Sequence, residues 1–140
     1  MKRLLPLIIL LTAVLCNVNA QDKDQNGDIR SFIIKMYEDK LYEDYDFLQK
    51  HCSSEFLKKL QEAYPYDADG VAYATWLFRS GQQDSKPGTN GKSCMLDVKA
   101  DKGDWYIYRA IDMGWEFTKR IKVFNTDGKI VISDICPIAD

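Results

Sequence analysis

The sequence predicts an α+β domain in which N-terminal helices pack on a curved antiparallel meander of four or more strands, in a cone-like shape with a pocket. Up to about residue 64, apolar residues recur at the 3.6-residue period of an amphipathic helix. From residue 94 onward they recur at every second position, as in strands with one buried face. The helices therefore come before the sheet, and we expect a single domain over residues 29–140.

The first twenty residues have the pattern of a secretory signal peptide. Lys2 and Arg3 precede an apolar run over residues 4–15, which is too short for a membrane span. The segment ends in Val18-Asn19-Ala20, with small residues at the two positions that a signal peptidase reads. We therefore expect cleavage after Ala20 and export to the periplasm or the extracellular space.

Lipidation at Cys16 is the alternative fate of this segment. Bacterial lipidation requires a small residue directly before the cysteine and usually a leucine three positions before it. Leu15 and Ala13 occupy those two positions, so the sequence favours a protein without a lipid anchor.

The chain that follows the predicted signal peptide is acidic. Without Lys2 and Arg3, it has 17 Lys and Arg against 21 Asp and Glu, a net charge of about −4. Its basic residues form no stripe, and nucleic-acid binding depends on such a stripe to neutralise phosphates. The composition therefore argues against a nucleic-acid partner. Residues 21–28 are polar, and we expect a flexible lead-in there.

Two helical regions are predicted before residue 65. Asp28 can cap the first helix, whose apolar face comprises Ile29, Phe32, Ile33, Met36, Tyr37 and Leu41. The second region covers about residues 44–64 and ends before Pro65. We expect a break near Cys52, where Ser53 or Ser54 can begin a new helix.

Residues 71–79 are apolar on all sides. Their length and alanines favour a short buried helix, and a strand stays open as the alternative. A loop is expected over residues 81–93, which contain two glycine turns.

Four antiparallel strands are predicted after this loop, over residues 94–100, 105–111, 115–124 and 129–136. Short turns at Gly103, at residues 112–114 and at Asp127-Gly128 separate them. With tight turns assumed, one face of the sheet collects Leu96, Val98, Tyr106, Tyr108, Ala110, Trp115, Phe117, Lys119, Ile121, Val123, Ile130, Ile132 and Asp134. We expect the helices to cover this face, and a single bulge would turn a strand over.

Trp105, Ile107 and Ile111 alternate onto the opposite face of the predicted sheet. Exposed apolar clusters of this kind often mark interfaces. We therefore predict a weak homodimer through that face.

Three cysteines follow the predicted signal peptide: Cys52, Cys94 and Cys136. The expected strand order separates Cys94 from Cys136 by three spacings of about 4.8 Å, beyond the limit of about 7 Å for a disulfide. Any disulfide should therefore join Cys52 with Cys94 or with Cys136. His51 is the single histidine and no two of the cysteines have metal-ligand spacing, so we predict no metal and no cofactor. Residues 22–29 match the first positions of a calcium-binding loop, but Ile33 stands where its last ligand, a glutamate, is required.

The last predicted strand carries Asp127-Gly128-Lys129-Ile130-Val131-Ile132-Ser133-Asp134-Ile135. With helices first and a long meander after them, this ending resembles the nuclear transport factor 2-like (cystatin-like) superfamily over about residues 28–136. Asp104-Trp105-Tyr106 and Asp112-Met113-Gly114 are similar to segments of small exported bacterial proteins of unknown function in it. The resemblance implies a cone whose sheet wraps a helix and leaves a pocket, used for catalysis or for binding. No catalytic set of the superfamily matches this chain.

The candidate pocket residues are Tyr106, Tyr108, Trp115, Lys119 and Asp134. We favour an exported binding domain for an unidentified small ligand, without catalysis. Two alternatives stay open: an inhibitor- or immunity-like domain that binds a protein partner, and an isomerase- or hydrolyase-like enzyme that uses Asp134 with Lys119 or Tyr106. Either Lys119 reaches solvent at the sheet edge, or it lines the pocket mouth with Asp134 and Tyr106.

Overall fold

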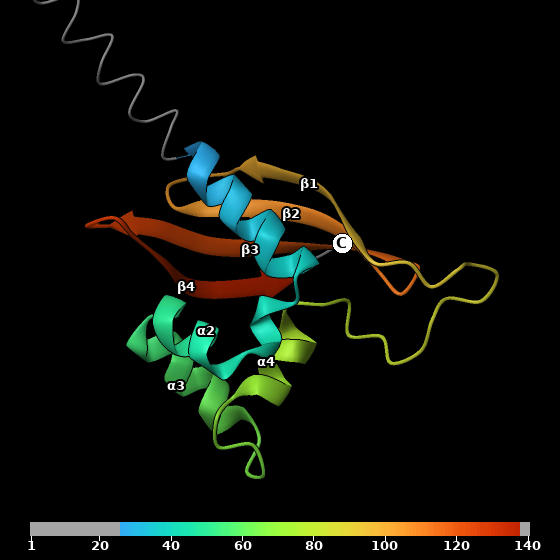
Figure 1. Cartoon of the computed structure of the whole chain (residues 1–140), viewed down its shortest axis with the longest axis horizontal. Coiled ribbons are helices and arrows are strands. Elements are labelled where there is room, and N and C mark those ends of the chain that lie inside the picture. The colour runs from blue at the N-terminus through green and yellow to red at the C-terminus, as the bar shows by residue number, and fades with distance from the viewer. Residues whose placement is uncertain (1–25, 138–140) are drawn as a thin grey trace, which may run out of the picture.

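Helices come first and the sheet last in the computed structural model, which describes residues 26–137 (Figure 1). The elements are an N-terminal helix over residues 26–38, η1 (Leu41–Glu43), α2 (Tyr45–His51), α3 (Ser54–Ala63), α4 (Val71–Leu77), β1 (Cys94–Ala100), β2 (Trp105–Asp112), β3 (Trp115–Thr126) and β4 (Lys129–Pro137). The strands form an open antiparallel sheet in the order β1-β2-β3-β4. This is the α+β class that the sequence predicts.

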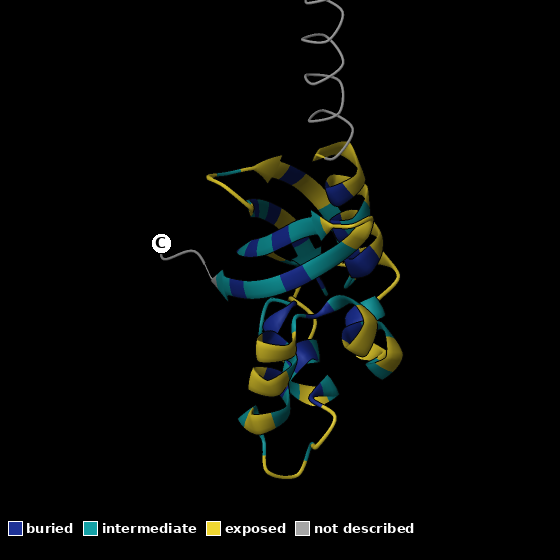
Figure 2. Ribbon diagram, turned by 90° about the vertical axis from the view of Figure 1, so that its left-hand side faces the viewer, coloured by how far each residue is buried: buried dark blue, intermediate teal, exposed yellow. Residues whose placement is uncertain are grey.

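The helices contact the sheet in two places. The N-terminal helix lies across one face of the sheet, where Tyr37 packs against Tyr108 of β2 and Phe117 of β3. The group of α2, α3 and α4 lies beside β4 (Figure 1). Buried residues line the sheet face and the helix sides turned toward it (Figure 2). No helix in the described part of the chain is long and apolar enough to cross a membrane.

The predicted break in the second helical region is confirmed. α2 ends at His51, and the hydroxyl of Ser53 accepts a hydrogen bond from the backbone N–H of Phe56 at 3.2 Å, which caps α3. Between the two helices, the N–H of Ser53 donates to the carbonyl of Ile132 in β4 at 2.9 Å. This contact joins the helix pair to the edge of the sheet.

The first helix begins earlier than the sequence predicts. Residues 26–28, expected in the flexible lead-in, are helical, so Asp28 lies inside the helix and does not cap it. The hydroxyl of Tyr106 donates to Asn26 Oδ1 at 2.8 Å. This contact with the sheet supports the first turn, and the local pattern around Asp28 could not reveal it.

Residues 71–77 are helical, which decides between the two alternatives for this segment. The carboxylates of Asp67 and Asp69 accept hydrogen bonds from the N–H groups of Ala72 and Val71, at 2.8 and 3.0 Å. They satisfy N–H groups of the first turn that have no partner within the helix. One side of α4 is buried, while Trp76 on another side is 49% exposed.

Two bulges and one turn change the predicted strand register. The irregularity between Met95 and Asp97 leaves Leu96 41% exposed, although the sequence places it on the core face. A tight turn at Asp112-Met113 would place Tyr108 opposite Phe117, but the turn lies at Met113-Gly114 and Tyr108 is opposite Lys119. A shift of two residues keeps each side chain on its predicted face.

The bulge between β3 and β4 has the larger consequence. Val123 lies opposite Ile132, as a two-residue turn at Asp127-Gly128 requires, but the register shifts between Lys122 and Val123. Beyond the shift, Ile135 lies opposite Ile121 and is 2% exposed. Asp134 lies opposite Lys122 and is half-buried, so its predicted place on the core face is wrong.

Cys52, Cys94 and Cys136 are free thiols in the described part of the chain, so the expected bridge from Cys52 is not formed there. Cys94 and Cys136 lie in β1 and β4, the two edge strands. Burial raises the pKa of Cys52 to about 12, which keeps this thiol protonated and unreactive at neutral pH.

The outer face of the sheet carries Trp105, Ile107 and Ile111, all half-buried. The guanidinium of Arg120 lies 4.4 Å from the ring centroid of Trp105 and covers part of it. The weak homodimer through this face stays a prediction.

Candidate functional site

The five predicted pocket residues do not meet in one site. The hydroxyls of Tyr106 and Tyr108 donate to Asn26 Oδ1 and to the carbonyl of Phe78, at 2.8 and 2.7 Å, and both side chains are buried. Both therefore belong to the core, where their polar ends have partners. The indole N–H of Trp115 instead donates to the carbonyl of Asp84 at 2.8 Å.

Lys119 and Asp134 also lie apart. Lys119 is 8% exposed, and its ammonium group lies 5.9 Å from the ring centroid of Trp76. Asp134 instead forms a long ion pair of 3.7 Å with Lys59. The acid/base pair of Asp134 with Lys119 or Tyr106 is therefore not formed, because the bulge in β4 turns the carboxylate away.

Lys119→Met should leave the free energy of unfolding at pH 7 unchanged or raise it. Burial lowers the pKa of Lys119, although Cys136 opposes this in part, so the folded state bears a cost for the charged form. Above its lowered pKa, Lys119 is neutral in the folded state, so the cost of burying its charge falls as the pH rises toward 10.5, the ordinary pKa of lysine. The stability gained by Lys119→Met should therefore be smaller at high pH than at pH 7. Urea unfolding at pH 7 and pH 10 measures both effects.

Lys122→Met is the matched control, because Lys122 is the half-buried lysine of the same strand with its ammonium group 6.0 Å from the ring centroid of Trp105. Because Lys122 lies beside Trp105 on the outer face of the sheet, this variant should not raise the free energy of unfolding. If Lys119→Met lowers the free energy of unfolding and Lys122→Met does not, burial of the charged Lys119 does not destabilise the folded state.

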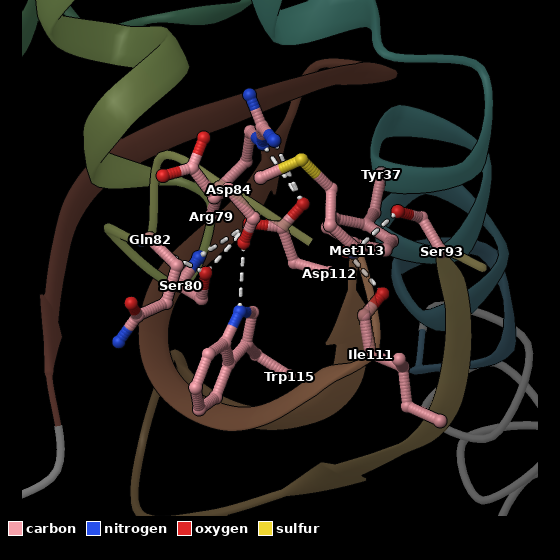
Figure 3. Close-up of polar contacts among 10 residues, drawn as sticks. All are labelled: Tyr37, Arg79, Ser80, Gln82, Asp84, Ser93, Ile111, Asp112, Met113 and Trp115. Atoms are coloured by element: carbon pink, nitrogen blue, oxygen red, sulfur yellow. Dashed lines mark hydrogen bonds and ion pairs between the residues drawn. The ribbon is translucent and has the colours of Figure 1, made fainter. Parts of the chain in front are cut away.

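A polar cluster that the sequence did not predict lies where β2 ends (Figure 3). Asp112 is 2% exposed, and its Oδ1 accepts from Nε and Nη2 of Arg79 at 3.1 and 2.9 Å. Its Oδ2 accepts from the hydroxyl and the N–H of Ser80 at 2.7 and 3.3 Å. Four donors therefore fill the hydrogen-bonding sites of this carboxylate.

Arg79 follows α4 and is held as a cation. Burial acts to lower its pKa, but the hydrogen bond and the charge of Asp112 outweigh burial, and the pKa is raised. Its side chain is 25% exposed, so the guanidinium reaches the surface beside the buried carboxylate.

The loop over residues 80–93 is fastened to the turn between β2 and β3. Met113 accepts at its carbonyl from the N–H of Lys86 at 2.8 Å, and its own N–H donates to the hydroxyl of Ser93 at 2.9 Å. The N–H of Gly114 donates to the carbonyl of Lys92 at 3.0 Å. Met113 has a φ of 49°, in the left-handed region that non-glycine residues seldom adopt. The loop thus holds the end of β2 in a fixed place beside Arg79.

An inner cavity of about 150 Å³ lies on one side of Arg79. The end of the N-terminal helix and η1 contribute Tyr37, Glu38, Lys40 and Tyr42, and the sheet end contributes Asp112 and Met113. The hydroxyl of Tyr37 donates to the carbonyl of Ile111 at 2.7 Å. Tyr42 is 2% exposed, and burial raises its pKa to about 12, so its hydroxyl keeps its proton at neutral pH.

An outer cavity of about 320 Å³ lies against Arg79 on the side of α4. It is lined by Thr75, Trp76, Gly81, Gln82, Gln83 and Met113, and it is more open than the inner cavity. Arg79 and Met113 line both cavities. The pair of Arg79 and Asp112 is therefore the centre of the candidate site.

One signal in the sequence could have identified Asp112 as a functional candidate. Tyr106, Tyr108 and Ala110 are buried at every second position of β2, and Asp112 continues that series. A carboxylate on a core face requires a cation or several donors. Nothing in the sequence indicates that Arg79, 33 positions earlier, supplies them.

No family model matches this sequence, and no curated protein matches it. A solved structure that is similar is a protein of unknown function from Bacteroides thetaiotaomicron, with a TM-score of 0.49 and 20% sequence identity. The alignment covers 86% of this chain and 99% of that one. A likeness at this level carries no argument about what this chain does.

Proposed function

We propose that this protein is a binding domain for a small molecule, which the inner cavity holds against Arg79. One observation carries the proposal: Arg79, whose guanidinium is fixed by a buried carboxylate, lines two cavities at once. Positioned polar groups of this kind orient ligands in binding pockets.

The sizes of the cavities support a small ligand. The inner cavity, at about 150 Å³, has the volume of an engineered cavity that accepts benzene. The outer cavity, at about 320 Å³, is at the lower end of the range for ligand pockets. A molecule of fewer than about ten non-hydrogen atoms suits the inner cavity by this comparison.

Binding without catalysis is the better match to the chemistry of this site. A general acid or base needs a pKa near the operating pH. Tyr42 has its pKa raised to about 12 by burial, and the hydrogen-bonding sites of Asp112 are filled by Arg79 and Ser80. Tyr42 is therefore unsuited to exchange a proton at neutral pH, and Asp112 has no free hydrogen-bonding site to offer a substrate.

Membership of the nuclear transport factor 2-like superfamily and export through residues 1–20 are further parts of this proposal. Helices that precede an open four-stranded antiparallel sheet support the first. The residue pattern of the segment supports the second, and that segment lies outside the described residues. N-terminal sequencing of the exported protein should begin at Gln21.

Ligand-observed NMR with a panel of small carboxylates, amides, amines and sugars tests the binding site. At least one compound should bind the full protein, and Arg79→Gln should weaken that binding at least tenfold, because the variant loses the guanidinium that lines both cavities. Arg109→Gln is the control, since Arg109 pairs with Glu116 at an exposed site on the sheet. Equal affinities in wild type and Arg79→Gln would contradict the proposal.

A further inference from the structure

Hydrogen-bond donors dominate the wall of the inner cavity at Arg79. A guanidinium has five N–H groups, and Arg79 uses two of them on Asp112 Oδ1. The other three, two on Nη1 and one on Nη2, have no partner among residues 26–137. The free N–H of Nη2 and one N–H of Nη1 form the end of the planar group, which is an edge that binds two oxygens side by side.

Tyr42 adds a further donor to the same cavity. Its side chain is buried, and its hydroxyl has no hydrogen-bond partner within the described residues. The raised pKa of Tyr42 means that this hydroxyl is present as O–H and can donate. Lys40, an exposed residue, also lines the cavity and adds a positive charge to its wall.

Acceptors on the wall of the cavity are few. Asp112 already accepts four hydrogen bonds, so it has none to offer a ligand. The oxygen of Tyr37 can still accept one, because its proton is donated to Ile111. Glu38, an exposed residue, and Ser93, whose hydroxyl accepts from the N–H of Met113, also line the cavity. A ligand that fills the inner cavity must therefore bring acceptors to Arg79 and Tyr42.

We propose that the ligand is a small carboxylic acid, bound as its carboxylate by the Nη1–Nη2 edge of Arg79 and the hydroxyl of Tyr42. This inference rests on the proposed binding function and adds the class of ligand to it. A carboxylate is planar and presents two oxygens at the spacing of a guanidinium edge, and charge-assisted hydrogen bonds are about twice as strong as neutral ones. The volume of about 150 Å³ leaves room for a short carbon chain behind the carboxylate.

Matched pairs of carboxylates and amides test the class of ligand. The probes are acetate, propionate and butyrate, their amides, and inorganic phosphate, each titrated into the full protein and followed by NMR. We expect at least one carboxylate to bind tenfold or more tightly than its own amide. Tyr42→Phe should weaken that binding about threefold to tenfold, and its amide affinity should change less, because a hydrogen bond to a charged group is the stronger one.

The possible results separate the ligand class from the binding function. If amides bind at Arg79 as tightly as carboxylates, the proposal that the ligand is a carboxylate is wrong, but the proposal of a binding site at Arg79 is retained. Phosphate that binds more tightly than every carboxylate would overturn it in favour of a tetrahedral oxyanion. If none of these probes binds but an amine or a sugar from the wider panel does, the class is wrong and the site is retained. If nothing in either set binds, both proposals fail.

Arg79→Gln and Arg109→Gln serve again as variant and control. Loss of the carboxylate preference in Arg79→Gln, with the preference kept in Arg109→Gln, is the expected result, since Arg109 lines neither cavity at Arg79. Because Arg79→Gln removes a partner of Asp112, Tyr42→Phe provides the test that leaves this ion pair in place.

Discussion

Asp112→Ala should lower the free energy of unfolding by about 3 kcal/mol, which is the low end of the range for removing one partner of a buried ion pair. The carboxylate is 2% exposed and accepts four hydrogen bonds, so its removal leaves the donors of Arg79 and Ser80 without their partner. The guanidinium is 25% exposed and regains some water, which is why we expect the low end. Urea unfolding followed by circular dichroism measures the change.

Glu116→Ala is the control for this prediction. Glu116 pairs with Arg109 at 2.8 Å, and its side chain is 56% exposed. Exposed ion pairs contribute about 0–1 kcal/mol, so this variant should unfold nearly as the wild type does. Equal losses in the two variants would mean that Asp112 does not hold the end of β2 as the structure indicates. Asp112→Ala should also weaken ligand binding, because Arg79 loses its fixed orientation.

Gly70→Ala should cost about 3 kcal/mol, from a strained backbone and a steric clash together. Gly70 has a φ of 82° and directly precedes α4. A β-carbon there would lie 2.9 Å from the β-carbon of Leu60 and 3.0 Å from the backbone nitrogen of Gln61. Both contacts are with fixed parts of α3, so α4 would have to move away from it. Thermal and urea unfolding both test this result.

Gly128→Ala separates the two causes. Gly128 has a φ of 79° in the turn between β3 and β4, and a β-carbon there meets no atom within 4 Å. It should therefore cost only the backbone strain, about 1 kcal/mol. If Gly70→Ala and Gly128→Ala cost the same, the close approach of α4 to α3 contributes nothing. Because α4 carries Trp76 and precedes Arg79, only the first variant should also alter binding.

The turn between β3 and β4 shows what local chemistry can predict. Asp127 and Gly128 both have positive φ, at 54° and 79°, as the two central residues of a type I′ turn require. The same reasoning identified the break near Cys52 and a cap at Ser53 or Ser54, because a serine hydroxyl can satisfy an N–H three residues later, and the structure selects Ser53. These features depend on neighbours in the sequence, so the sequence contains the information.

The bulge in β4 shows where such reasoning ends. Ile130, Ile132 and Asp134 share one phase in the sequence, yet Ile135 takes the buried place and Asp134 pairs with Lys59. One extra residue in a strand reverses every later side chain. Ser133 and Asp134 are consecutive polar residues followed by apolar Ile135, so the alternation is interrupted there. The assumption of tight turns without a bulge nevertheless kept Asp134 in the phase of Ile130 and Ile132. For this reason the side chains of Lys119 and Asp134 do not lie together.

The sequence by itself determined the order of helices and strands, most of the core face and the turns, because periodicity and turn chemistry are properties of neighbouring residues. Only the tertiary structure decided which polar side chains meet. Tyr42, Arg79 and Asp112 lie in η1, after α4 and at the end of β2, and they line one cavity only once the sheet has formed. Which side chains pair between such distant segments depends on their distances in the folded protein, and sequence periodicity contains no information about those distances.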